Sequence, residues 1–340
     1  MFEALSVPRR PNWKLRMVVA AIVLALFWGI AWLLRMTQMP LTSYGGPLPP
    51  LSQEQSQLAE RLSAHVKYLS VTIGERSIPR AGSLKATTNY LRSNLLQAGY
   101  SVQEHTYSVA GQEVSNVESD LPGSDSTTGT IIVGAGVAGT VGANDNATGV
   151  AAVLELARLL RASKLRRTVR FVLFVNEEPP YFQTDNMGSL AYARQIRRDG
   201  IPVSAMISLE TIGFFSDAPG SQKYPPVLSF FYPSRGNFIG FVGNEESRGL
   251  VRRSIHRFRE STSFPSEGVA APANWPGVGW SDHWSFWQEN YPAIMVTDTA
   301  AFRYPHYHTP RDTFDKVDFE KMARVVDGVR GVVEFLANER

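Results

Sequence analysis

The chain has 340 residues, of which 44% are hydrophobic and 19% are charged, which allows a large buried core and excludes an intrinsically disordered protein. It contains no cysteine, which excludes a disulfide framework, thiol catalysis and thiolate-bound metals, so any metal must be held by His, Asp or Glu. The formal charge of +3 comes from the first 35 residues, which carry +4 and leave −1 for the rest. The folded part therefore has no excess of basic residues that would indicate a nucleic-acid partner.

An uncharged apolar run, Met17–Leu34, lies near the amino terminus between two arginines. Its length is close to the roughly 17–25 residues that cross a bilayer as a helix. Four basic residues and one acid precede it, and Lys and Arg favour the cytoplasmic side. We therefore expect a cytoplasmic tail (1–16), a transmembrane anchor (17–35) and a catalytic domain on the non-cytoplasmic side of the cell membrane. A cleaved signal peptide is the alternative, but Leu33–Met36 lacks the small residues of a cleavage site.

A segment rich in Pro, Gly and Ser, residues 36–53, is typical of a semi-rigid spacer. From residue 54 to residue 340, helical patterns alternate with short apolar runs, which predicts one α/β domain with a mostly parallel central sheet flanked by helices. Helices are expected at 54–69, 83–98, 147–161, 189–198, 245–260 and 319–336. Strands are expected at 101–109, 130–135, 168–175, 203–209 and 293–297.

Four segments place acids or histidines at the expected carboxyl ends of strands, where ligands bind in open α/β sheets. They contain Asp145 within Asn-Asp-Asn, the pair Glu177 and Glu178, the acid Glu210, and His306 with His308. Each segment alone has an ordinary structural explanation. An Asn-Asp-Asn turn commonly caps a helix, paired acids can belong to a solvated loop, and a lone histidine is usually structural.

Together with Trp280–Phe286, the four segments resemble, in order and spacing, the co-catalytic zinc aminopeptidase family of peptidase clan MH, which also contains the glutaminyl cyclases. The resemblance covers residues 55–337 and implies an α/β sandwich that holds two zinc ions. It implies that Glu177 is the general base. The metal ligands that it implies are Asp145, Glu178, Glu210 and His308. Three further residues would lie behind these ligands or beside the substrate: Asp282, His283 and Tyr307.

The chain departs from the family near Gly136. Where the family has Gly-Ala-His-Tyr-Asp, with the histidine on the second zinc, this chain has a glycine after Ala135, and no histidine occurs between His105 and His256. The first site keeps three protein ligands, whereas the second keeps only two carboxylates, a set better suited to magnesium or manganese. We therefore expect one zinc per chain, with the second site weak or empty.

These observations predict a membrane-anchored, zinc-dependent metallopeptidase that acts as an aminopeptidase on peptide substrates. Two alternatives stay open. The first is a catalytically silent, peptidase-like binding module on the outer face of the membrane. The second is a single-zinc acyltransferase of the glutaminyl-cyclase type, because those enzymes work with the same three ligands that this chain retains.

Overall fold

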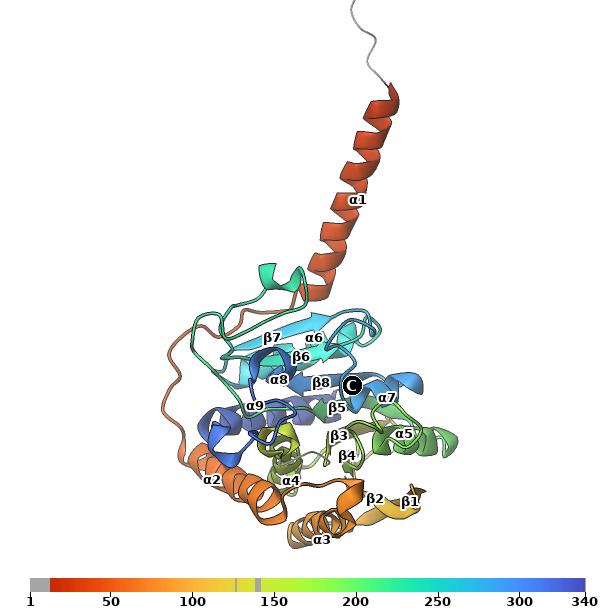
Figure 1. Cartoon of the computed structure of the whole chain (residues 1–340), viewed down its shortest axis with the longest axis vertical. Coiled ribbons are helices and arrows are strands. Elements are labelled where there is room, and N and C mark those ends of the chain that lie inside the picture. Colours follow the sequence, from red (N-terminus) through yellow and green to blue (C-terminus); the bar gives the residue numbers. More distant parts are fainter. Residues whose placement is uncertain (1–12, 126, 138–141, 340) are drawn as a thin grey trace, which may run out of the picture. The chain divides into compact units, whose positions relative to one another are not determined.

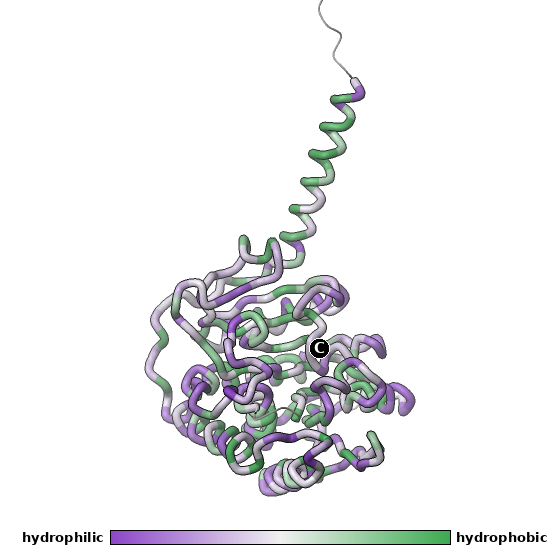
Figure 2. The backbone as a smooth tube through the Cα atoms, in the orientation of Figure 1, coloured by the Kyte–Doolittle hydropathy of each residue, from purple (hydrophilic) through white to green (hydrophobic). Residues whose placement is uncertain are grey.

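The computed structural model describes residues 13–125, 127–137 and 142–339 (Figure 1). The chain divides after Gln38 into two compact units. The first contains helix α1 (Trp13–Thr37), which has 25 residues. It includes a stretch of mean hydropathy 2.6 that has no buried residue. Figure 2 shows this helix as mostly apolar. By length and composition α1 can cross a membrane, and it includes the whole of the apolar run Met17–Leu34.

The second unit, which begins at Met39, is built on a sheet that has eight strands in its described residues, in the order β1-β2-β4-β3-β5-β8-β6-β7. The strands are β1 (Gln103–Val109), β2 (Gln112–Leu121), β3 (Thr130–Gly136), β4 (Val169–Phe174), β5 (Val203–Leu209), β6 (Ile239–Gly243), β7 (Ser266–Ala270) and β8 (Ala293–Thr297). Neighbours among β4, β3, β5 and β8 are parallel, as are β6 and β7, while β1–β2, β2–β4 and β6–β8 are antiparallel. The expected α/β fold with a mostly parallel centre is confirmed.

Helices cover both faces of the sheet (Figure 1). One face packs against α3 (Ala81–Gln97), α4 (Gly149–Leu160), α6 (Arg248–Ser261) and α9 (Phe319–Asn338), and α2 (Gln53–Lys67) packs against α4 and α9. The other packs against α5 (Gly188–Arg198) and α7 (His283–Gln288), and the short α8 (Ala300–Arg303) follows β8. Since successive side chains of a strand point to opposite faces, Ile131 and Val133 join the first core and Ile132 joins the second.

All the helices expected from periodicity are present, with their ends shifted by a few residues. The structure adds three strands that the sequence did not indicate, β2, β6 and β7. Of the segment expected to be a spacer, residues 38–52 contain no helix or strand, and from Met39 it belongs to the second unit. There Arg259 donates hydrogen bonds to the carbonyls of Pro40 and Leu41, at 2.9 and 2.8 Å.

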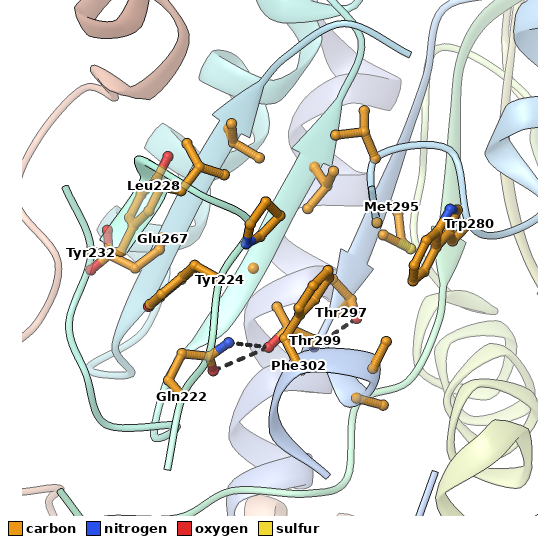
Figure 3. A pocket seen from close by; sticks show the side chains of 18 of the residues that line it. Gln222, Tyr224, Leu228, Tyr232, Glu267, Trp280, Met295, Thr297, Thr299 and Phe302 are labelled. Carbon is orange, nitrogen blue, oxygen red and sulfur yellow. Dashed lines mark hydrogen bonds between the residues drawn. The ribbon is translucent and has the colours of Figure 1, made fainter. Parts of the chain in front are cut away.

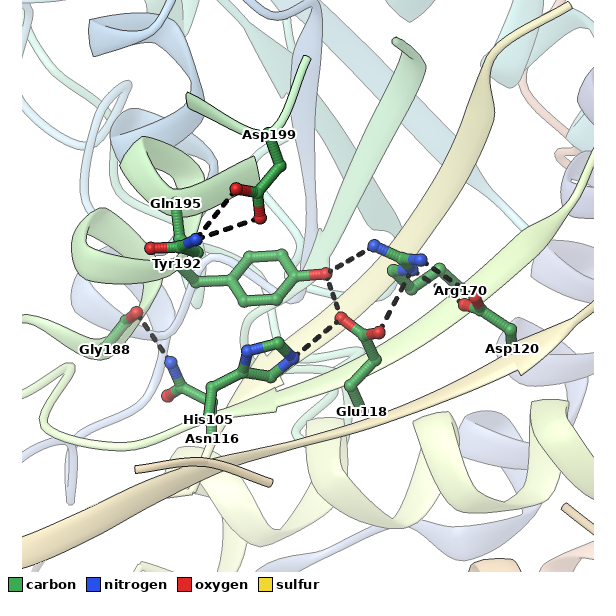
Figure 4. A network of polar contacts seen from close by, with 9 residues as sticks. All are labelled: His105, Asn116, Glu118, Asp120, Arg170, Gly188, Tyr192, Gln195 and Asp199. Atoms are coloured by element: carbon green, nitrogen blue, oxygen red, sulfur yellow. Dashed lines mark hydrogen bonds and ion pairs between the residues drawn. The ribbon is translucent and has the colours of Figure 1, made fainter. Parts of the chain in front are cut away.

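Strand β2 escapes sequence recognition because it buries polar residues (Figure 4). Glu118, only 2% exposed, accepts a hydrogen bond from the Tyr192 hydroxyl, and its other oxygen lies 3.5 Å from Nε of Arg170. Arg170 also donates to both carboxylate oxygens of Asp120, at 2.7 and 2.8 Å. This network compensates the buried charges, so β2 can pair with β4 without an apolar pattern.

Another polar side chain of β2, Asn116, fixes the end of β4. Its Oδ1 accepts the amide proton of Val175 at 3.0 Å, and its Nδ2 donates to the carbonyl of Gly188 at 2.9 Å. The amide of Gly188 in turn donates to the carbonyl of Val175. Asn116 therefore ties the start of α5 to the strand end that leads into Glu177.

We predict that Asn116→Ala destabilises the protein by about 1–3 kcal/mol, because it leaves two buried backbone groups without partners. Urea denaturation of the full chain in detergent measures the change. The matched control is Asn94→Ala, since Asn94 makes a single side-chain bond to its own helix, at Tyr90. Equal stability of the two variants would contradict a bridging role for Asn116.

Candidate active site

The acids singled out in the sequence meet at one edge of the sheet. Glu177 and Glu178 follow β4, Glu210 follows β5, and Asp145 lies in the segment between β3 and α4. Because β4, β3 and β5 are parallel neighbours, their carboxyl ends lie at the same edge. His308 reaches this edge from the loop that follows α8.

Three of these side chains form a compact group of donors. Nε2 of His308 lies 3.1 Å from Oδ2 of Asp145 and 3.1 Å from Oε2 of Glu178. Among the described residues this is the one group of at least three His, Asp or Glu donors whose atoms all lie within 4.8 Å of one another. Hydrogen bonds to the carboxylates of Asp145 and Glu178 raise the pKa of His308 to about 10. The two carboxylates therefore favour a positive charge between them.

The group fits a zinc ion. Ligand atoms about 2.0–2.1 Å from a tetrahedral zinc lie about 3.3 Å apart, close to the separations that His308 makes with Asp145 and Glu178. One imidazole and two carboxylates are common zinc ligands, and they leave a fourth position for water or substrate. Glu178 is partly exposed, which gives such a ligand access.

Two aspartates outside this group hold its backbone in place. The carboxylate of Asp312 accepts the amide protons of Asn144 and Asp145, at 2.9 and 2.8 Å. The carboxylate of Asp298 accepts the amide protons of Gly213 and Phe214, at 3.1 and 2.8 Å, and a bond from the side chain of Asn144. These bonds connect the loops that follow β5 and β8 to the segment that carries Asp145.

Arg76 adds a buried cation beside the same segment. It is fully buried, and it donates to the carbonyls of Val137 and Gly142, at 2.8 and 2.9 Å. Burial lowers the pKa of Arg76. The negative charges of Asp145, Asp312 and Glu178 oppose this shift. The sequence offered no signal for Arg76, because it lies far from the motifs and in no recognisable pattern.

Glu177 lies beside the donor group and is only 7% exposed. Burial and the nearby carboxylates of Glu178, Asp282 and Asp145 raise its pKa well above the usual range. Within the part of the chain that the structure describes, no hydrogen bond reaches its carboxyl group. A carboxyl group without a hydrogen bond of its own, next to three potential metal ligands, is in a position to exchange a proton with a molecule bound there.

The second metal position expected for the family has fewer protein ligands in this chain. Of its ligands only Asp145 and Glu210 are present, and Nδ2 of Asn146 already donates to Oε2 of Glu210. A Cβ atom on Gly136 would lie 2.9 Å from Cβ of Glu177, closer than such atoms approach one another. Glu177 therefore occupies part of the space that a side chain at position 136 would need.

The three residues expected behind the ligands have different surroundings. Asp282 is fully buried, and its Oδ2 would lie 3.5 Å from a Cβ atom on Gly136. The ring of Tyr307 stacks on that of His308, with 3.9 Å between centroids. His283 lies outside the donor group, because its Nε2 contacts the carbonyl of Val278 at 2.7 Å.

Two cavities have candidate site residues in their walls. The first encloses about 830 Å³, part of it open to solvent, and Glu210 and Tyr307 belong to its wall. Its other walls are largely apolar (Figure 3) and include Phe238, Phe241, Val278, Trp280, Met295 and Phe302. The second encloses about 930 Å³ on the same measure and has Glu178 and His308 in its wall. Candidate site residues therefore belong to the walls of two cavities, one of them largely apolar.

Comparison with known proteins agrees with this architecture. The chain is 38% identical over 282 residues to the protein YfbL of Escherichia coli (strain K12), a match that covers 79% of this chain and 86% of that one. It is 31% identical over 226 residues to leupeptin-inactivating enzyme 1 of Streptomyces exfoliatus, and it spans about half of that longer protein (63% of this chain, 49% of that one).

Among solved structures, LapA of Legionella pneumophila superposes with a TM-score of 0.68 at 19% identity, covering 86% of this chain and 79% of that one. The zinc aminopeptidase BSAP of Bacillus subtilis gives 0.66 at 13% identity, with coverages of 83% and 95%. The glutaminyl cyclase of Porphyromonas gingivalis gives 0.61 at 20% identity, with coverages of 81% and 97%.

The match to YfbL extends over most of both chains, which indicates common descent and not only a common fold. In addition, the sequence profile of "Peptidase family M28" matches residues 116–333, which include every candidate metal ligand and Glu177. The chain belongs to peptidase family M28.

Proposed function

We propose that this protein is a membrane-anchored aminopeptidase that works with a single zinc ion. The observation that carries the proposal is the group formed by Asp145, Glu178 and His308, with the unpaired carboxyl group of Glu177 beside it. A zinc ion held by these three ligands would polarise the scissile carbonyl and lower the pKa of a water molecule to about 7. Glu177 accepts the proton of the attacking water and passes it to the leaving amine.

The two cavities support an assignment of the parts of the substrate. The apolar cavity, which begins at Glu210 and Tyr307, receives the side chain of the first residue of the peptide. The opening bordered by Glu178 and His308 receives the part of the peptide that leaves. Apolar walls favour a large apolar first residue, because its burial removes hydrocarbon surface from water.

Helix α1 supports attachment to a membrane. Its apolar length is sufficient to cross a bilayer, and the basic residues before it favour a cytoplasmic amino terminus. In this arrangement the peptidase unit lies on the non-cytoplasmic side of the cell membrane and cleaves peptides there.

We predict that Glu177→Gln lowers peptide hydrolysis by about 10²–10⁴-fold while the zinc content stays unchanged, because the variant loses a proton acceptor and no metal ligand. Steady-state kinetics and elemental analysis of the same preparation measure both quantities. Glu178→Gln and His308→Ala are the comparison, since each should lower zinc content as well as rate. A fully active Glu177→Gln protein would remove Glu177 from the mechanism.

We predict that the purified full chain binds close to one zinc tightly, measured by elemental analysis after dialysis against a weak chelator. Asp145, Glu178 and His308 would bind this ion. The second metal position has a glycine, Gly136, where the family has a histidine. Two tightly bound zinc ions per chain would contradict our reading of the second position. A chain that binds no zinc would instead favour the silent binding module, and zinc binding with cyclase but no peptidase activity would favour the acyltransferase.

We predict that the full chain fractionates with membranes and that protease added outside intact spheroplasts digests the peptidase unit. A variant that lacks residues 1–36 is the control, because it should be recovered without membranes. Complete protection of the peptidase unit in spheroplasts, with digestion only after lysis, would reverse the proposed orientation.

A further inference from the structure

A loop of the second unit, residues 224–234, carries an exposed apolar tip. The loop contains no charged residue. Phe230 at its tip is 84% exposed, the largest exposed fraction among the large hydrophobic side chains of the described residues. Val227 is 43% exposed. Hydrocarbon held in water costs free energy, so these side chains gain from any surface that covers them.

The base of this loop is held together, which keeps the tip turned outward. The rings of Tyr224 and Tyr232 stack with 5.6 Å between their centroids. The hydroxyl of Tyr224 donates to the carbonyl of Pro233 at 2.6 Å. Leu228, between the two tyrosines, is buried. The exposure of Phe230 therefore belongs to a loop whose other apolar side chains are packed.

The loop adjoins the segment that follows α1. The hydroxyl of Tyr232 donates to the carbonyl of Gly268 on β7 at 2.7 Å. On the same glycine, a Cβ atom would lie 2.9 Å from Cγ of Met39. The hydroxyl of Ser43 accepts the amide proton of Ser266 at 2.9 Å, which fastens the segment to the same strand. The start of the second unit and the loop therefore both contact β7.

Chain length limits how far Met39 can be from the end of α1, whatever the orientation of the two units. Helix α1 ends at Thr37, and two peptide units span at most about 8 Å. The apolar run of α1 ends at Leu34, before Arg35, which is where a spanning helix meets the headgroups. With α1 across a bilayer, Met39 lies close to the lipid surface, and so does the part of β7 that it contacts.

The composition of the loop suits a lipid surface better than a protein partner. Aromatic side chains favour the interface between lipid and water, and the exposed Lys223 and Arg235 on either side of the loop can meet lipid phosphates. A stable protein interface needs about 800 Å² on each partner, much more than two exposed side chains provide. A bilayer accepts single side chains without such an area.

We propose that the loop inserts its tip, with Phe230, into the surface of the bilayer that α1 crosses. The inference rests on the proposed membrane attachment and extends it to the substrate. Tyr224, Leu228 and Tyr232 belong to the wall of the apolar cavity (Figure 3). A loop that touches lipid thus brings this cavity to the membrane surface, where the enzyme meets apolar peptides that are adsorbed there.

The test uses the absence of cysteine from the chain, which allows one fluorescent label at a chosen position. Ser229→Cys is the probe, because Ser229 is exposed beside Phe230 and leaves that side chain intact. The labelled full chain is reconstituted into vesicles of phosphatidylcholine and phosphatidylglycerol, some with a nitroxide near the headgroup end of the acyl chain. We expect the nitroxide to lower the fluorescence to less than about half, because interfacial segments lie roughly 5–10 Å deep.

Ser93→Cys is the matched control, since Ser93 is also an exposed serine. It lies on α3, which packs against β2, and β2 is far from β7 in the strand order. A label there should keep at least about nine-tenths of its fluorescence, because it lies outside the interfacial layer. Adding Phe230→Asp to the Ser229→Cys chain should reduce the quenched fraction at least about twofold, because a carboxylate is costly in lipid. Unchanged zinc content shows that this variant is folded.

Equal quenching at positions 229 and 93 in vesicles that retain the protein would overturn the lipid contact and leave the attached peptidase in place. Quenching at 229 that does not respond to Phe230→Asp would also contradict insertion of the tip. Flotation of the vesicles without the protein would remove the proposed attachment and the lipid contact together. Absence of Glu177-dependent hydrolysis removes the proposed activity, whereas selective quenching at 229 would still support the lipid contact.

Discussion

The position of Asp145 depends on the pair of hydrogen bonds that the Asp312 carboxylate accepts from the amides of Asn144 and Asp145. Asp312 lies shortly after His308, so these bonds join two candidate zinc ligands that are distant in the sequence. The hydroxyl of Tyr304 donates a third bond to Asp312 at 2.8 Å. A buried carboxylate with three donors is well compensated, which makes it a rigid support instead of a group that needs a metal.

Asp298 is a second buried carboxylate that supports the backbone around the site. It follows β8 and accepts bonds from the amides after Glu210 and from the side chain of Asn144. Asn144 thus contacts both supporting aspartates, one through its amide and the other through its side chain. The geometry of the metal group therefore depends on loops from β3, β5 and β8 together, and not on any one motif.

The sequence predicted most of the fold because helical and strand periodicities differ clearly in the apolar segments, such as α4 and β4. It failed for β2, whose buried Glu118 is compensated by residues from β4 and α5 that only the tertiary structure brings close. At the site, the resemblance named the residues that form the donor group. It gave no indication of Asp298 and Asp312, because the backbone amides that these carboxylates accept are brought to them only by the tertiary structure.

Gly136 lies where the end of β3 closely approaches Glu177, which follows β4. With glycine at position 136, the end of β3 comes near enough to Glu177 that no Cβ atom fits between them. The volume that an imidazole would need is bordered by Glu177 and Asp282, and one oxygen of Glu210 is engaged by Asn146. A Gly136→His substitution would therefore bring the new side chain against Glu177, the proposed general base. A larger side chain at position 136 therefore requires either Glu177 or the backbone of this loop to move.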